Sequence, residues 1–169
     1  CITNYLINKN HTHISYINIS EKYNFANERK DSFLKCLKYN NIKFNKNYYA
    51  SIKLEEPEKS FDIIRKMLTK NKKITSIICS TEFSALSAIK VCNHLKLKIG
   101  KDISIVTFDG PLVSDLSTPP ITAASFPVKE LGKRAINILL NKKGGLTKSN
   151  NYLAKSNIIE RGSVHKVRK

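Results

Sequence analysis

Three side chains have the chemistry to grip a small polar molecule: Arg29, Thr81 and Asp109. A guanidinium offers five donors in a fixed planar fork, and an ionised carboxylate makes the stronger kind of hydrogen bond with hydroxyl groups. A threonine at the start of a helix places its hydroxyl beside backbone N–H groups that have no partner within the helix. These residue types together indicate a site for a polyhydroxylated or anionic small molecule.

The elements that must position these residues alternate between two hydrophobic periods. Short β-branched and aromatic runs predict strands, and apolar residues three and four apart predict helices. We expect strands over residues 14–19, 48–53, 74–79, 103–108, 121–125 and 157–160. We expect helices over residues 26–41, from 57 through 68, from 85 through 92 and over 128–141, with residues 111–120 as a proline-rich loop.

Repeated strand–helix alternation predicts an α/β fold, in which right-handed crossovers build a parallel sheet with helices on both faces. Ligands of such sheets bind outside the carboxyl ends of the strands. That rule points to residues 20–29, 80–82 and 108–110, which contain the three candidate side chains. The fold class and the chemistry of the residues therefore indicate the same edge of the sheet.

The positions of the glycines exclude the common nucleotide-binding loops. All six glycines lie at position 100 or later, whereas a GxGxxG or GxxxxGK[ST] loop needs glycines between the first strand and the first helix. The GxSxG sequence of an α/β-hydrolase is also absent. We therefore predict a binding protein without cofactor or metal ion, and not an enzyme. Two enzyme-like alternatives stay open: Cys79 acting with His94, and a phosphate-accepting Asp109 in a flavodoxin-like domain.

The chain is strongly basic, with 30 Lys and Arg against 13 Asp and Glu in 169 residues and a net charge of +17. Twenty-five of the basic residues are lysines, scattered over the whole sequence. We interpret them as solvated surface charges, and a nucleic-acid-binding surface is the alternative.

The remaining composition indicates a cytoplasmic protein. The four cysteines form no CxxC pair, which is typical of free thiols in a reducing compartment. The sequence contains no run of 18 apolar residues that could span a membrane and no signal-peptide pattern. It starts without an initiator Met, and we expect a fragment or a processed product.

Six segments occur in one characteristic order. Asn10-His11 precedes the first strand, residues 26–33 read ANERKDSF and residues 103–110 read ISIVTFDG. Further along, residues 118–122 read TPPIT, residues 126–135 read FPVKELGKRA and residues 159–164 read IERGSV. As a set, these segments resemble the C-terminal half of the effector-binding domain of LacI/GalR-type transcriptional regulators.

The resemblance implies roles for individual residues. Arg29 and Asp109 match the family's effector-contacting arginine and the first aspartate of its FDD pair. Several other positions depart from the family, which commonly has Asn-Asp at 81–82, an aromatic residue at 55 and glutamine at 126. The residues implied to contact the effector are Arg29, Asp109, Thr81, Glu82, Phe126 and Glu55. The departures leave the identity of the effector open.

The resemblance also implies a two-lobed, periplasmic-binding-protein-like domain of type I, of which this chain holds largely the C-terminal lobe. We expect residues 1–12 to be a remnant of the N-terminal lobe and residues 13–118 to be the C-terminal lobe. Residues 119–148 would be a crossover and a helix of the N-terminal lobe, and residues 149–169 a closing strand and a basic tail.

The function implied is allosteric. A small, carbohydrate-like effector would bind this domain and change the affinity of a homodimeric regulator for operator DNA, which is read by a headpiece outside this chain. The alternative is a solute-binding protein of a transport system with the same fold.

Overall fold

The computed structural model describes residues 2–53, 56, 58–108, 111–140 and 154–168. Its strands are β1 (Ile14–Ile19), β2 (Tyr49–Ile52), β3 (Ser76–Cys79), β4 (Ser104–Phe108), β5 (Thr122–Ser125) and β6 (Asn157–Ile159). Its helices are α1 (Ile2–Asn8), α2 (Asn24–Tyr39), α3 (Lys59–Lys70), α4 (Glu82–His94), α5 (Pro111–Leu116) and α6 (Val128–Leu140), with a short 3₁₀ turn η1 (Lys46–Tyr48) before β2.

The strands form one sheet in the order β2-β1-β3-β4-β5-β6. The first four pairings are parallel, as the strand–helix alternation predicts. The last pairing, between β5 and β6, is antiparallel, so the sheet is mostly rather than entirely parallel. Helix α6 lies between β5 and β6, but none of its residues is buried, so it does not pack on the sheet as the crossover helix that joins parallel strands does.

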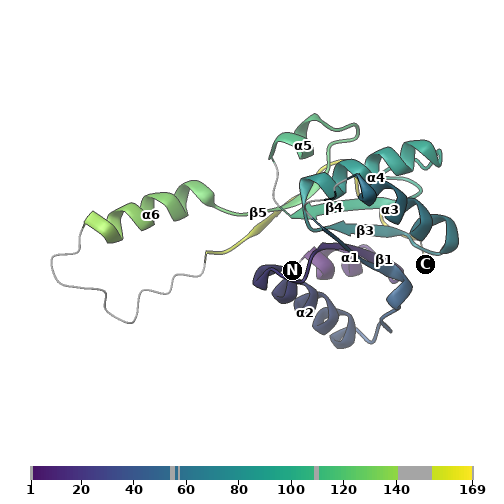
Figure 1. Ribbon diagram of the computed structural model, residues 1–169, viewed down its shortest axis with the longest axis horizontal. Helices are drawn as coiled ribbons and strands as arrows, with labels where there is room; N and C mark the ends of the chain where they lie inside the picture. Colours follow the sequence, from purple (N-terminus) through teal and green to yellow (C-terminus); the bar gives the residue numbers. More distant parts are fainter. Residues whose placement is uncertain (1, 54–55, 57, 109–110, 141–153, 169) are drawn as a thin grey trace.

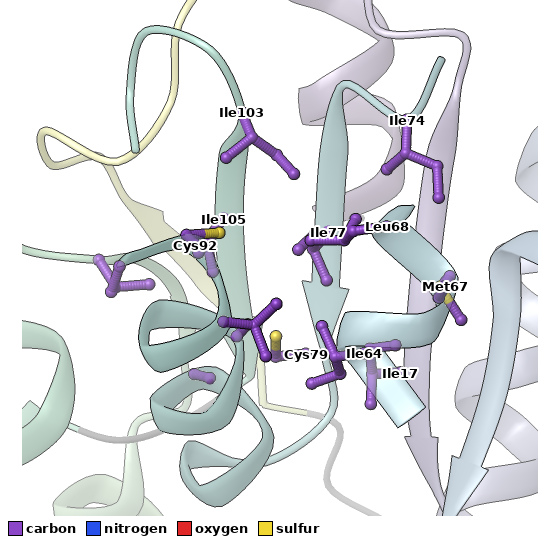
Figure 2. Packing of buried hydrophobic residues seen from close by; sticks show 14 of the residues in the cluster. Ile17, Ile64, Met67, Leu68, Ile74, Ile77, Cys79, Cys92, Ile103 and Ile105 are labelled. Carbon is purple, nitrogen blue, oxygen red and sulfur yellow. The ribbon is translucent and has the colours of Figure 1, made fainter. Parts of the chain in front are cut away.

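Alternate strand residues face opposite sides of the sheet and build two cores. The helices lie on both sides of the sheet (Figure 1). On one side, Ile77 and Ile105 are fully buried with residues of α3 and α4. Figure 2 shows this core, in which the strand side chains meet Ile64 of α3 and Cys92 of α4. On the other side, α1 and α2 cover a second set of strand residues. The predicted α/β fold with helices on both faces is therefore confirmed.

Two helices were not expected from the sequence. Helix α1 lies within residues 1–12, and its Leu6 is fully buried in the same core as Tyr16 and Ile78, so the helix packs as part of the main body. Helix α5 occupies the first part of the segment 111–120, where the prediction of a loop was wrong. Proline is compatible with the first position of a helix because no N–H is required there.

Helix α6 lies apart from the rest of the chain (Figure 1). None of its residues is buried, and its Val128, Leu139 and Leu140 are each at least 70% exposed. Among the described residues, then, nothing covers the apolar side of this helix. Each helix in the described part of the chain is too short or too polar to span a lipid bilayer.

Candidate functional site

Arg29 lies on the second turn of α2, close to the carboxyl edge of the sheet. Its Nη1 donates to the backbone oxygen of Ser80, just after β3, at 3.1 Å. Three phenyl rings surround the guanidinium carbon, with centroids 4.5 Å away for Phe108, 5.2 Å for Phe25 and 5.9 Å for Phe126. A cation near aromatic faces is attracted by the electrons of the rings. The guanidinium is therefore held in place by the ends of several elements.

A buried hydrogen-bond network fixes the start of α2 against the sheet. Asn18 of β1 is fully buried, and its Nδ2 donates to the backbone oxygen of Ala26 at 3.0 Å and to the hydroxyl of Tyr49 at 3.2 Å. Its Oδ1 accepts from the hydroxyl of Tyr16 at 3.2 Å. Burial raises the pKa of Tyr16 above its ordinary value and that of Tyr49 to about 12. Both hydroxyls therefore stay protonated and can donate.

The outer end of this network is a surface ion pair. The hydroxyl of Tyr49 donates to Oε1 of Glu21 at 2.8 Å, and Nζ of Lys30 lies 2.6 Å from the same oxygen. The hydrogen bond from Lys30, with that from Tyr49, holds the pKa of Glu21 below its ordinary value. Since Lys30 follows Arg29 on α2, this contact also restrains the helix that carries the guanidinium.

A cavity of about 430 Å³ opens beside Arg29. Its volume is within the usual range for small-molecule sites. Its lining, mainly apolar with a few polar groups, is also typical of such sites. The polar side chains on it include Thr3, Glu28, Ser32 and Ser156. The apolar side chains are Ile2, Phe25, Phe33, Ile78, Phe108, Ala124, Phe126 and Ile158, together with the ring of Tyr16.

The structure brings two of the predicted site residues together, since Arg29 and Phe126 both line this cavity. Thr81 lies elsewhere: it caps α4, accepting from Ser84 N at 3.2 Å, while its own N–H donates to the hydroxyl of Ser84. It lines a separate hollow that is far too small for a sugar.

Glu82, the half-buried first residue of α4, is also not among the residues lining the cavity beside Arg29. Asp109 and Glu55 lie outside the described residues.

Sequence reasoning did not single out the other aromatic residues of the site. Phe25 and Phe108 lie in the segments 20–29 and 108–110, which the strand-end rule had already selected. A second signal was available for Asn18, because an amide within an otherwise apolar strand must find partners when it is buried.

The described residues offer little for metal or thiol chemistry. They contain no group of three or more His, Cys, Asp or Glu side chains that could hold a metal ion. Cys36, Cys79 and Cys92 are buried and free, as predicted for thiols. Burial raises the pKa of Cys92 to about 12 and that of Cys79 above its ordinary value, so neither forms the thiolate that a nucleophile requires.

Comparison with known proteins identifies the domain. The family of periplasmic binding protein-like domains matches residues 3–164. The HTH-type transcriptional repressor PurR of Histophilus somni is 30% identical over 140 residues, which are 83% of this chain and 42% of that protein. The chain thus spans less than half the length of this relative.

Solved structures show the same fold. The Escherichia coli transcriptional repressor AscG superposes with a TM-score of 0.87 at 20% identity, over 97% of this chain and 59% of that one. The transcriptional regulator CelR, solved as a cellobiose complex, superposes with a TM-score of 0.84 at 17% identity, over 95% of this chain and 49% of that one. The chain therefore belongs to the family of periplasmic binding protein-like domains, and its relatives identify it as part of the effector-binding domain of a LacI/GalR-type regulator.

Proposed function

We propose that this chain senses a small, sugar-like effector for a LacI/GalR-type transcriptional regulator, and that the effector binds in the cavity beside Arg29. The observation that carries the proposal is the guanidinium held among three phenyl rings at the wall of a cavity of about 430 Å³. The guanidinium supplies directed donors for hydroxyl or anionic groups. The rings supply flat apolar faces for the less polar face of a ring-shaped ligand.

A saccharide is the first ligand class to test. The cavity combines few polar side chains with broad apolar walls, which suits a molecule that has both hydroxyl groups and C–H faces. The structure of CelR was solved with cellobiose, a disaccharide. In the proposal, Arg29 and Phe126 contact the effector directly. Asp109, which follows β4 in sequence, is the proposed carboxylate partner for its hydroxyl groups.

The regulatory step follows from a two-lobed arrangement. Within the expected segment 119–148, we assign helix α6 to the other lobe, a proposal supported by the lack of any buried residue in it. Strand β5 of the same segment pairs with β4 in the sheet of this chain. An effector bound between the lobes would favour one arrangement of them, and so change how two DNA-reading headpieces of a homodimer are spaced. Coupling of this kind is worth about 1–3 kcal/mol. A regulator that reads operator DNA would act in the cytoplasm.

Other functional classes receive less support. The relatives named above are transcriptional repressors and regulators, which points to a regulator and not to an enzyme. For the same reason a solute-binding protein of a transport system is not favoured.

Calorimetric titration of the chain with cellobiose and a panel of monosaccharides tests the proposal. We expect one member of the panel to bind, and the variant Arg29→Ala to lose affinity by about tenfold or more, because a hydrogen bond from a charged donor is worth about 1.5–3 kcal/mol. The matched control is Arg65→Ala on α3, whose guanidinium pairs with Asp62 away from the cavity. Equal affinity in both variants and the parent chain would reject the site.

A further inference from the structure

The segments that precede the strands form one continuous surface at the amino edge of the sheet. Residues 38–48, 70–75 and 96–103 precede β2, β3 and β4, and the start of β1 and the tail 164–168, which follows β6, lie beside them. Backbone hydrogen bonds join neighbours in this row, from Thr75 N to His13 O at 3.0 Å and from Ser104 N to Thr75 O at 2.9 Å. The tail is attached in the same way, because Val167 N donates to Lys9 O at 2.9 Å.

This amino edge carries a strong excess of positive charge. Eleven exposed basic residues lie on its segments: Lys38, Lys43, Lys46, Lys70, Lys72, Lys73, Lys96, Lys98, Lys101, Lys166 and Arg168. Asp102 is the only acidic residue within the same segments, all of which are described. Lysines that look scattered along the sequence are therefore gathered in space, because a parallel sheet brings the starts of its strands to one edge.

Helix dipoles do not cancel this charge. Helices α2, α3 and α4 end at the amino edge, and each helix C-terminus acts as roughly half a negative charge. Three such termini offset about one and a half positive charges, against eleven basic side chains and one acid. Some lysines do stabilise the helix ends, but the helix dipoles neutralise only a small part of the positive charge at the amino edge.

The opposite edge of the sheet is different. Among its described residues, Glu21, Glu56, Glu58 and Glu82 follow the strands, and two of them pair with lysines at 2.6–2.7 Å. The net charge of +17 is thus distributed unevenly, with the amino edge as its most basic part.

We propose that the amino edge of the sheet binds the phosphate backbone of double-stranded DNA, independently of the effector cavity and of any headpiece. Neighbouring strands are about 4.8 Å apart, so the row from β2 to β5 extends over roughly 20 Å, comparable to several base pairs of duplex. An open hollow of about 380 Å³, lined by Lys96 and Lys98, lies on this surface.

An anionic membrane fits the same surface less well. The strength of membrane binding by a protein surface scales with the apolar area that it buries as well as with electrostatic attraction to anionic lipids. On the described amino-edge segments, the only exposed large apolar side chains are Tyr39 and Phe44, both near β2. The rest of the row exposes mainly lysine and asparagine, which suit contacts with phosphate oxygens.

Fluorescence anisotropy with a labelled DNA duplex of mixed sequence tests the proposal. We expect binding at low salt, near 50 mM, that weakens steeply as salt is added, because counterions are released from the phosphates. The edge variant combines Lys46→Gln, Lys72→Gln, Lys73→Gln and Lys98→Gln. It should bind about tenfold or more weakly, and its salt slope should fall by about 3.

The matched control combines Lys22→Gln, Lys66→Gln, Lys129→Gln and Lys133→Gln, which removes the same charge from other surfaces. If binding depends on where the lysines lie, the affinity of this control for the duplex should stay within about threefold of that of the parent chain, because salt screens charges at long range. Circular dichroism confirms that both variants are folded. Equal losses in the two variants, no binding of the duplex at low salt, or binding to phosphatidylglycerol vesicles in its place would each overturn the proposal. None of these outcomes depends on the effector titration.

Discussion

The most direct stability prediction concerns His11, which lies just before β1 and is fully buried. Its Nδ1 lies 2.9 Å from Thr75 Oγ1, and its Nε2 lies 3.0 Å from the backbone oxygen of His165 and 3.1 Å from Ser104 Oγ. Burial is the main reason that the pKa of His11 falls from 6.5 to about 4. We expect acid to destabilise the protein, because the folded core holds the imidazole of His11 in its neutral form.

The sign and size of the effect follow from linkage. Between pH 6.5 and 4 the unfolded chain binds a proton at His11 that the folded chain does not, so stability is present above pH 6.5 and is lost as pH falls. The shift is worth about 3 kcal/mol in full, of which about 2 kcal/mol is lost between pH 8 and pH 5. The pKa of His165 is also lowered by burial, which adds in the same direction.

Urea unfolding at a series of pH values measures this loss. Carboxylates with lowered pKa values, such as those of Glu21 and Glu160, titrate below their ordinary value of 4.5, so the window above pH 5 isolates the histidines. The control is His11→Asn, which should be less stable at pH 8 but should lose clearly less stability on acidification. A free energy of unfolding of the parent chain that is constant from pH 8 to pH 5, or an equal loss in the control, would show that protonation of His11 does not limit stability.

The other predictions concern stability measured by urea or thermal unfolding. Ser163→Ala should cost about 2 kcal/mol, because its buried hydroxyl donates to the backbone of β4 at 2.6 Å and accepts from the backbone of β5 at 2.8 Å; an unchanged midpoint would contradict this. Gly100→Ala should cost about 2 kcal/mol or more, because φ is +78° and a Cβ would collide with the carbonyl of Gly162, whereas the control Gly132→Ala in open space on α6 should cost nothing. Lys96→Gly should stabilise by about 0.5–1 kcal/mol, because Lys96 has φ +57° at the end of α4; a loss of stability would count against this account.

The elements of the main body could be predicted because their hydrophobic periods are clear. The first strand has the predicted bounds, and β3, β4 and β5 differ from prediction by one or two residues at their starts. Helix α1 was missed because its seven residues give too little length for a period to show. The direction of β6 depends on its pairing with β5, which short local patterns do not encode.

The site was predictable only in outline. The strand-end rule selected the segments that hold Arg29, Phe25 and Phe108, because parallel sheets place strand ends together. The same rule selected Thr81, whose side chain instead forms a capping box with its own helix, a local bond that competes with ligand contact. The gathering of lysines at the amino edge also required the strand order, since the sequence alone shows them scattered.

Nuclear magnetic resonance titration of the labelled chain with cellobiose and the monosaccharide panel tests most directly whether this chain recognises a small molecule beside Arg29. We expect one saccharide at millimolar concentration to shift the resonances of Arg29, Phe108, Phe126 and their neighbours around the cavity. The absence of shifts with every saccharide, or shifts confined to residues away from that cavity, would show that the effector does not bind beside Arg29.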